Sequence, residues 1–315
     1  MTILTKTLQI TSLIGLNKKV KKKNSLSKFL QLRFNLAFMS CLPGCLINAY
    51  VWFLAKLYFF IKPELLIEVQ KHIYTVMKDY DKKQIKQLSN RVIKGLIKHY
   101  QEKMINGFLK KKQLREYLFK NISFDKAEIL LKEVLKEERG VIIATGHYGA
   151  LEFLPVFLAM KGYPTSVVAK FSSERLKKII VPRFVEEGLE IIVPEDVNNV
   201  LRAASNAIQQ NHIYISSCDE ADEWHRDKAN TMEFLGQTLH PDRTLKVLSK
   251  RTGAIQLVGL LRRKGSDDYE FILERIPDEC DEKNIQILKT LEKYIYRYPD
   301  QWYEWNEYEK FASAS

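Results

Sequence analysis

The stretch VIIATGHYGALEF, residues 141–153, opens with a short apolar run and continues into a histidine, two glycines and a glutamate. An apolar run of this length before a glycine is typical of a buried strand. Similar runs recur along the chain, separated by segments with helical spacing of apolar residues, and they cover residues 140–145, 165–170, 189–193, 212–217, 254–262 and 269–276. This alternation predicts an α/β fold with a mostly parallel central sheet flanked by helices.

Titratable side chains follow two of the predicted strands at the point where each strand ends. His147 follows the first strand and Asp219 follows the fourth. Ligands of parallel sheets bind beyond the carboxyl ends of the strands, so both are candidate site residues. Glu152 lies five positions after His147, and residues with that spacing in one helix are about 140° apart around its axis. His147 must therefore precede the helix if the two side chains are to meet, and Gly146 and Gly149 would permit the turn.

A carboxylate of Glu152 that reached the imidazole of His147 would fix the tautomer and orientation of the ring. The other ring nitrogen would then be free to act as a general base. A helix beginning just after His147 would disfavour the imidazolium and offer N–H groups to a developing oxyanion. This chemistry suits the deprotonation of a hydroxyl or amine that attacks an acyl thioester. Spacing alone favours a simpler interpretation, in which His147 hydrogen-bonds at a strand end while Glu152 is solvated.

The amino-terminal part of the chain is basic and apolar. The 315 residues carry a net charge of +12, yet no Asp or Glu precedes Glu64. A lysine cluster at 18–28 is followed by LAFMSCLPGCLINAYVWFLAKLYFFI, residues 36–61, in which Lys56 is the only charge. That run is long enough to cross a bilayer. It could equally lie in the membrane interface, or form a buried core helix of a soluble protein.

The division expected from these patterns has four parts. They are a basic arm at 1–35, a membrane-anchoring apolar helix at 36–62, a helical segment packing on the core at 63–120, and an α/β domain at 121–311. A basic segment beside an apolar run favours an anionic membrane surface as partner. It argues against a nucleic acid, since no basic groove studded with aromatic residues accompanies the charge.

The cysteines give no sign of a metal site or a disulfide framework. The four are Cys41, Cys45, Cys218 and Cys280, and none forms a CxxC pair. A zinc site from Cys218 with His225 and His240 is conceivable, but this spacing matches no familiar zinc pattern. We therefore expect no metal.

Several blocks in order resemble one family. GVIIATGHYGALEF (140–153) resembles the signature block of the bacterial lipid A late (lauroyl/myristoyl) acyltransferases, an apolar strand followed by H-x4-D/E. HIYISSCDE resembles the family's later strand ending in Asp, and MEFLGQTLHPDRTLKVLSKRTGAIQLVGLLRRKG is similar to its next segment. YPDQWYEWNEY resembles the family's close. The resemblance runs from about residue 121 to 308.

The resemblance implies a membrane-bound enzyme of lipid A and lipopolysaccharide biosynthesis, with a glycerol-phosphate acyltransferase-like fold, on the cytoplasmic face of the inner membrane. It implies transfer of a fatty acyl chain from acyl carrier protein or CoA to a lipid or glycolipid, with the thioester as co-substrate and no cofactor. By resemblance His147 is the base and Glu152 orients it. The expected substrate-binding residues are Gly149, Lys170, Arg175, Asp219 and Arg262.

Two departures leave the acceptor open. From Asp219 the chain reads DEADEWHRDKANTMEFLG, which is longer and more charged than in the family, and its close contains Glu304, Glu307 and Glu309. A phosphorylated lipid A precursor would favour a basic rim, so another phospholipid or glycolipid is an alternative acceptor. A catalytically silent, membrane-associated scaffold of the same fold is the alternative from a different functional class.

Overall fold

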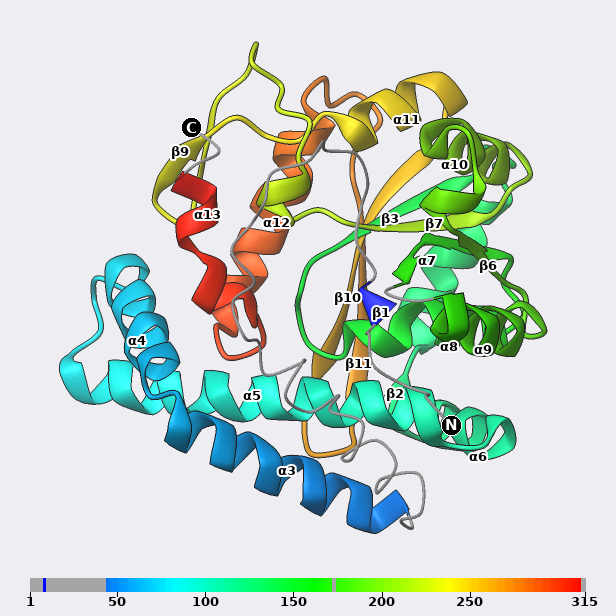
Figure 1. Ribbon diagram of the computed structural model, residues 1–315. Coiled ribbons are helices and arrows are strands. Elements are labelled where there is room, and N and C mark those ends of the chain that lie inside the picture. Colours follow the sequence, from blue (N-terminus) through cyan, green and yellow to red (C-terminus); the bar gives the residue numbers. More distant parts are fainter. Residues whose placement is uncertain (1–7, 10–43, 172–173, 313–315) are drawn as a thin grey trace.

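A computed structural model describes residues 8–9, 44–171 and 174–312 and contains a seven-stranded central sheet (Figure 1). The strands run in the order β2-β11-β10-β3-β7-β4-β6. They are β2 (Ile122–Ser123), β3 (Val141–Thr145), β4 (Thr165–Val168), β6 (Leu189–Ile192), β7 (Ile213–Ser217), β10 (Ile255–Arg263) and β11 (Tyr269–Arg275). Within this sheet, as far as the structure describes it, only the β10–β11 pair is antiparallel. The predicted α/β class with a mostly parallel sheet is therefore confirmed.

Helices cover both faces of this sheet. One face packs against α6 (Lys111–Asn121), α7 (Asp125–Leu135), α8 (Leu154–Met160) and α9 (Glu174–Val185), and the other against α10 (Val200–Gln209), α11 (Thr244–Thr252) and α12 (Lys283–Arg297). Within β3, Val141 and Ile143 pack on the face covered by α6 to α9, while Ile142 and Ala144 pack on the face covered by α10 to α12. Successive side chains of a strand point to opposite faces, so a strand buried on both faces is apolar throughout.

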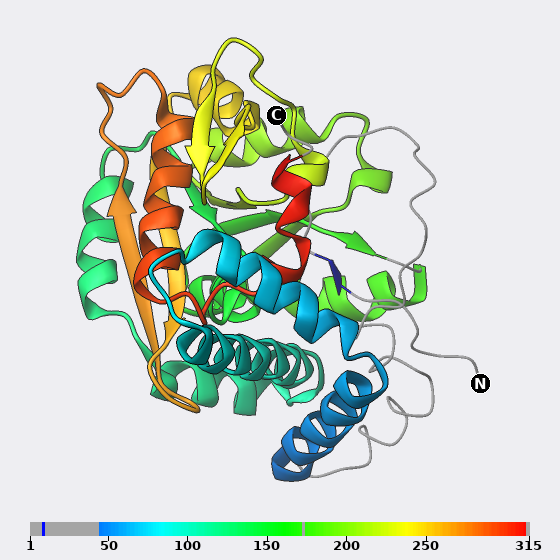
Figure 2. The ribbon, with the colours of Figure 1, turned by 90° about the vertical axis from the view of Figure 1, so that its left-hand side faces the viewer.

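The amino-terminal helices lie beside the sheet, along one edge of the molecule (Figures 1 and 2). They are α3 (Gly44–Ile61), α4 (Glu64–Val76) and α5 (Lys82–Phe108). Asp81 and Gln84 close the start of α5 with a reciprocal capping box, which satisfies two backbone N–H groups at the helix end. Both α3 and α4 pack on α5.

The part of the chain expected to contact membrane is only partly described. The apolar helix predicted for 36–62 is seen from Gly44 to Ile61, and residues 36–43 lie outside the described residues. The basic arm at 1–35 also lies outside them, except for Leu8–Gln9, which form β1 and pair with β5 (Lys170–Phe171). In the described ranges, no helix combines the length and apolar character needed to cross a bilayer.

After α12 the chain turns back over the carboxyl edge of the sheet. It forms the short helices η4 (Glu304–Glu307) and α13 (Glu309–Ala312), which lie between α4 and the sheet (Figure 2). Trp302 and Trp305 are fully buried there, with ring centroids 5.1 Å apart. His72 of α4 contacts the carbonyl oxygen of Trp305 through Nδ1 at 2.6 Å. The carboxy-terminal segment thereby becomes one wall of the site at the end of β3.

Candidate active site

His147 and Asp219 form a hydrogen-bonded pair at the carboxyl ends of two neighbouring strands. β3 and β7 run parallel and pair Thr145 with Ser217, so the residues just beyond them meet. Nδ1 of His147 lies 2.8 Å from Oδ1 of Asp219, and the backbone N–H of His147 donates to Oδ2 at 2.7 Å. Nε1 of Trp302 donates to the same Oδ2 at 2.9 Å. With a carboxylate accepting at Nδ1, the nitrogen left for chemistry is Nε2.

This pairing corrects the predicted partner of His147. Glu152 is buried in the short helix η1 (Leu151–Phe153), but its carboxylate faces α5. Its Oε1 lies 3.1 Å from Nζ of Lys103 and 3.8 Å from Nε2 of His99. The ion pairs of the described residues include none between His147 and Glu152. The tight turn after His147 directs the Glu152 side chain away from the imidazole, so Asp219 is the carboxylate that orients His147.

Carboxylates surround the imidazole on both sides. Glu220 Oε1 lies 3.5 Å from Nε2 of His147, and Glu304 follows Tyr303, whose ring is edge-on to the imidazole at 5.5 Å. Burial opposes protonation of the imidazole, but the charges of Asp219, Glu304 and Glu220 outweigh it and raise the pKa of His147 to about 10. The neighbouring carboxylates therefore favour the protonated form of His147.

The same interactions act on the carboxylates. Burial tends to raise the pKa of Asp219, but the charge of His147 and three hydrogen bonds lower it below its usual value. Burial and the neighbouring Asp219 raise the pKa of Glu304 against the attraction of His147. Of these two carboxylates, Asp219 is thus the one that stays ionised more readily.

Backbone hydrogen bonds fix the loop that carries His147. Gly149 has φ +58° and donates its N–H to the carbonyl of Gln301 at 2.9 Å, while Ala150 donates to Leu261 at 2.8 Å. A Cβ on Gly149 would lie 1.9 Å from the carbonyl oxygen of Leu261. Tyr148 donates its N–H to the carbonyl of Gly146. The N–H groups of residues 148–150 are thus already bonded and not offered to an oxyanion, and Gly149 permits the close backbone approach.

The predicted contact Arg262 and its neighbour Arg263 have different surroundings. Arg262 pairs with Glu270 at 2.6 Å and lies over the ring of Tyr298 at 4.4 Å. Arg263 is nearly fully buried and makes two bonds to Glu102, at 2.7 and 2.6 Å. It also donates to the carbonyl oxygen of Gly149. Arg263, which the sequence did not single out, is therefore the arginine bonded to the His147 loop.

The other two predicted cations lie on the strand and helix that follow β4. Lys170 in β5 pairs with Glu223 at 2.9 Å. Arg175 belongs to the first turn of α9, and its side chain is not among those described. These positions leave a contact of either residue with an anionic acceptor as a prediction.

Tyr303 belongs to the site but was not predicted from the sequence, because nothing in its spacing relates it to His147. Tyr303 donates its backbone N–H to the carbonyl of His147 at 3.0 Å and stacks on His99 at 4.3 Å. Its hydroxyl is buried with no hydrogen-bond partner among the described residues. Burial and the charge of Glu152 raise the pKa of Tyr303 well above its usual value, so the hydroxyl stays a neutral donor. Only the WYEWNEY block of the family resemblance hinted at this wall.

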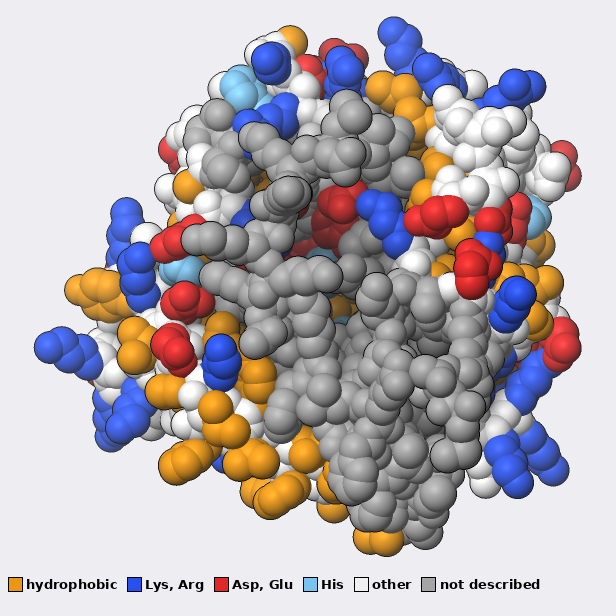
Figure 3. Space-filling view, viewed as in Figure 1, with side chains coloured by type: hydrophobic (Ala, Val, Ile, Leu, Met, Phe, Trp, Pro, Cys, Tyr) orange, Lys and Arg blue, Asp and Glu red, His pale blue; other side chains and the backbone are white. Residues whose placement is uncertain are grey.

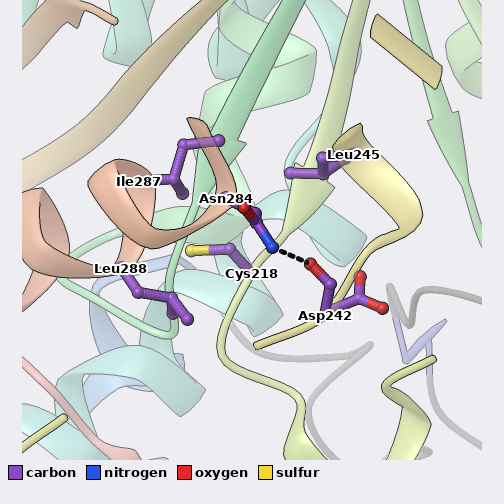
Figure 4. A pocket seen from close by; sticks show the side chains of 6 residues that line it. All are labelled: Cys218, Asp242, Leu245, Asn284, Ile287 and Leu288. Atoms are coloured by element: carbon purple, nitrogen blue, oxygen red, sulfur yellow. Dashed lines mark hydrogen bonds between the residues drawn. The ribbon is translucent and has the colours of Figure 1, made fainter. Parts of the chain in front are cut away.

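A small cavity beside Cys218 holds no substrate-sized space. It is lined by Cys218, Asp242, Leu245, Asn284, Ile287 and Leu288 (Figure 4) and has a volume of about 10 Å³. That is room for one water molecule at most. Burial raises the pKa of the Cys218 thiol well above its usual value, which makes it a poor nucleophile or metal ligand. Among the described residues, no cluster of His, Cys, Asp or Glu has the arrangement to hold a metal.

Comparison with known proteins adds no relative: no protein-family model matches the chain, and no curated protein matches it significantly.

Proposed function

We propose that this protein is an acyltransferase that moves a fatty acyl chain from a thioester donor to a hydroxyl or amine of a lipid or glycolipid. The observation that carries the proposal is the His147–Asp219 pair beyond the carboxyl ends of β3 and β7, with Nδ1 bonded at 2.8 Å. An imidazole held this way by a buried carboxylate is suited to general acid–base chemistry at Nε2. The ordered resemblance to the lipid A late acyltransferases supports the choice of acyl transfer.

The proposed reaction uses His147 first as a base and then as an acid. In the neutral form of His147, Nε2 takes the proton of the acceptor O–H or N–H as the acceptor oxygen or nitrogen bonds to the thioester carbonyl carbon. The tetrahedral intermediate then expels the thiolate, breaking the C–S bond, and Nε2–H returns its proton to sulfur. Asp219 stabilises the imidazolium formed between these steps. Tyr303, a buried neutral donor beside the imidazole, is suited to hydrogen-bond the substrate.

The setting of the reaction follows from the same resemblance. We propose a protein bound to the cytoplasmic face of the inner membrane, with acyl carrier protein or CoA delivering the acyl chain. The fold is proposed to be of the glycerol-phosphate acyltransferase type. Neither a metal nor a nucleic acid has a part in this reaction.

The charge around His147 favours an acceptor other than a phosphorylated lipid A precursor. Glu220 and Glu304 add two carboxylates beside the imidazole, and the nearby Lys310 is paired with Asp222 at 2.7 Å and with Glu307. A phosphate close to the reacting group would meet like charge there. A neutral polyol or an amine fits this environment better, so the second candidate is an acyltransferase for another phospholipid or glycolipid.

Replacing His147 tests the proposal. Lipids from cells lacking the gene are compared by mass spectrometry with lipids from cells expressing wild type, His147→Ala or the control His240→Ala. His240 hydrogen-bonds the carbonyl of Asn230, away from the proposed chemistry. Wild type and the control should restore a missing acyl chain, and His147→Ala should transfer it about 10²–10⁴-fold more slowly. Full restoration by a stably expressed His147→Ala protein would instead support the silent scaffold.

A further inference from the structure

Helix α3 has two apolar faces, and among the described residues only one of them is buried against the rest of the protein. Val51, Leu54, Ala55, Tyr58 and Phe59 are buried. The helix packs against α5. A helix buried on one side against α5 presents its opposite side outward.

The outward face of α3 is also apolar. Trp52 is 51% exposed, Phe53 57% and Phe60 84%, and Leu57 and Ile61 are exposed as well. These positions recur at intervals of four and eight residues, which places them on one stripe of the helix. Ile67 and Tyr74 add exposed apolar side chains on α4. Figure 3 shows hydrophobic side chains gathered along the lower edge of the molecule, where Figure 1 places α3.

Charge divides the molecule into two parts. Residues 44–121 contain 16 Lys and Arg against 6 Asp and Glu, whereas residues 122–315 contain 26 against 32. Lys56 places its Nζ over the Trp52 ring, 5.3 Å from the centroid. A lysine beside an exposed tryptophan matches the depth at which a bilayer changes from headgroup to hydrocarbon.

We propose that the outward face of α3, continued by Ile67 and Tyr74 of α4, docks in the plane of an anionic lipid bilayer. We call the exposed residues Trp52, Phe53, Leu57, Phe60 and Ile61 the α3 face. This docking rests on the proposed function, which supplies the lipid acceptor, and it adds the surface of the protein that contacts the lipid. Lying flat buries the α3 face while Val51 and Ala55 stay packed on α5. The excess of lysine and arginine over residues 44–121 complements anionic headgroups.

A second copy of this chain fits the α3 face less well than a bilayer does. Dimerisation through it would bring together two segments that each carry 16 basic and 6 acidic residues. Like charges facing one another across an interface are unfavourable, whereas anionic lipid attracts both charge and apolar surface. The partner chosen is therefore a lipid surface.

Vesicle flotation with the full chain tests the proposal. The α3-face variant carries Trp52→Ser, Phe53→Ser and Phe60→Ser. The control variant carries Ile129→Ser, Val185→Ser and Tyr296→Ser, which are also exposed apolar positions but lie on α7, α9 and α12. Vesicles are phosphatidylcholine alone or phosphatidylcholine with phosphatidylglycerol at a ratio of about 7 to 3, at low and high salt.

Wild type and the control should bind the anionic vesicles, and part of that binding should survive high salt because apolar burial is not screened. The α3-face variant should bind about tenfold more weakly or worse. His147→Ala should bind like wild type, so failure of the proposed chemistry and failure of the docking surface are distinguishable. Equal binding by the α3-face variant, or complete release of wild type by salt, overturns the proposal.

Sedimentation of the same proteins without lipid tests whether a second copy of this chain, instead of a bilayer, covers the α3 face. A wild-type dimer that becomes a monomer only in the α3-face variant would assign the face to a second copy and overturn the lipid docking.

Discussion

Two buried carboxylates lie near the loop that carries His147, and they contact different parts of the molecule. Asp219 follows β7 and contacts the start of the loop, whereas Glu152 belongs to η1 at its end. The carboxylate of Asp219 is hydrogen-bonded to Nδ1 of His147, to the backbone N–H of His147 and to Nε1 of Trp302. Glu152 lies against Lys103 and His99 of α5, and Asn106 of the same helix donates to its carbonyl oxygen at 3.1 Å. Asp219 thus orients the His147 imidazole, while Glu152 links the end of the loop to α5 through these contacts.

Tyr303 lies between these two regions. Its ring stacks on His99 at 4.3 Å and stands edge-on to His147 at 5.5 Å. The rings of His99 and Tyr303 therefore connect the surroundings of Glu152 with the imidazole of His147. A change at Glu152 should alter the position of the loop, whereas a change at Asp219 should alter the proton affinity of His147.

The largest effect on the rate is expected for Asp219→Asn. The amide removes the charge that stabilises the imidazolium and can hold the ring in the wrong tautomer, so acyl transfer should fall about 10²–10⁴-fold. The wild-type rate should rise with pH as His147 loses its proton, because its carboxylate neighbours raise the pKa to about 10. In Asp219→Asn that rise should move to lower pH. Rates measured between neutral and alkaline pH check both statements.

An unmoved pH dependence in Asp219→Asn would remove Asp219 as the partner that sets the protonation of His147. Circular dichroism and thermal unfolding of the variant show whether its fold is retained.

Gly149→Ala should give the next largest loss of rate, because it disturbs the loop between the two carboxylates. The new Cβ would lie 1.9 Å from the Leu261 carbonyl at φ +58°. A left-handed conformation costs a non-glycine residue about 1–2 kcal/mol, and displacing the backbone adds to that. Gly236→Ala is the matched control, since φ there is +77° with nothing within 4 Å of the added Cβ. Thermal unfolding should show a larger loss for Gly149→Ala, and equal losses would mean that the close approach is unimportant.

Glu152→Gln should have the smallest effect on the rate, less than about tenfold, because the amide can still accept a hydrogen bond from Lys103. Loss of the charged hydrogen bond should cost about 1–3 kcal/mol of stability. The pH at which the rate rises should stay where it is in wild type. Denaturant unfolding and the pH–rate curve of the same preparation measure the two effects. A shift of the curve as large as that of Asp219→Asn would restore Glu152 as the orienting partner.

The contrast shows how far a motif of linear spacing can be trusted. His147 and Glu152 are five residues apart, but a turn with Gly149 at positive φ followed by η1 separates their side chains. Asp219 is 72 residues from His147, and the parallel pairing of β3 with β7 brings it within 2.8 Å. The same holds for Arg262 and Arg263, since adjacent residues of a strand point to opposite faces.

The sequence by itself determined six of the seven strands of the central sheet, its mostly parallel arrangement, and the location of His147 and Asp219 at its carboxyl edge. Those features follow from the local spacing of apolar residues and from the rule that parallel strands end together. Only the tertiary structure decided which carboxylate meets the imidazole, which arginine is bonded to the loop and which face of α3 is left exposed. These depend on the direction of side chains after a turn and on neighbours far away in the chain, and linear spacing encodes neither.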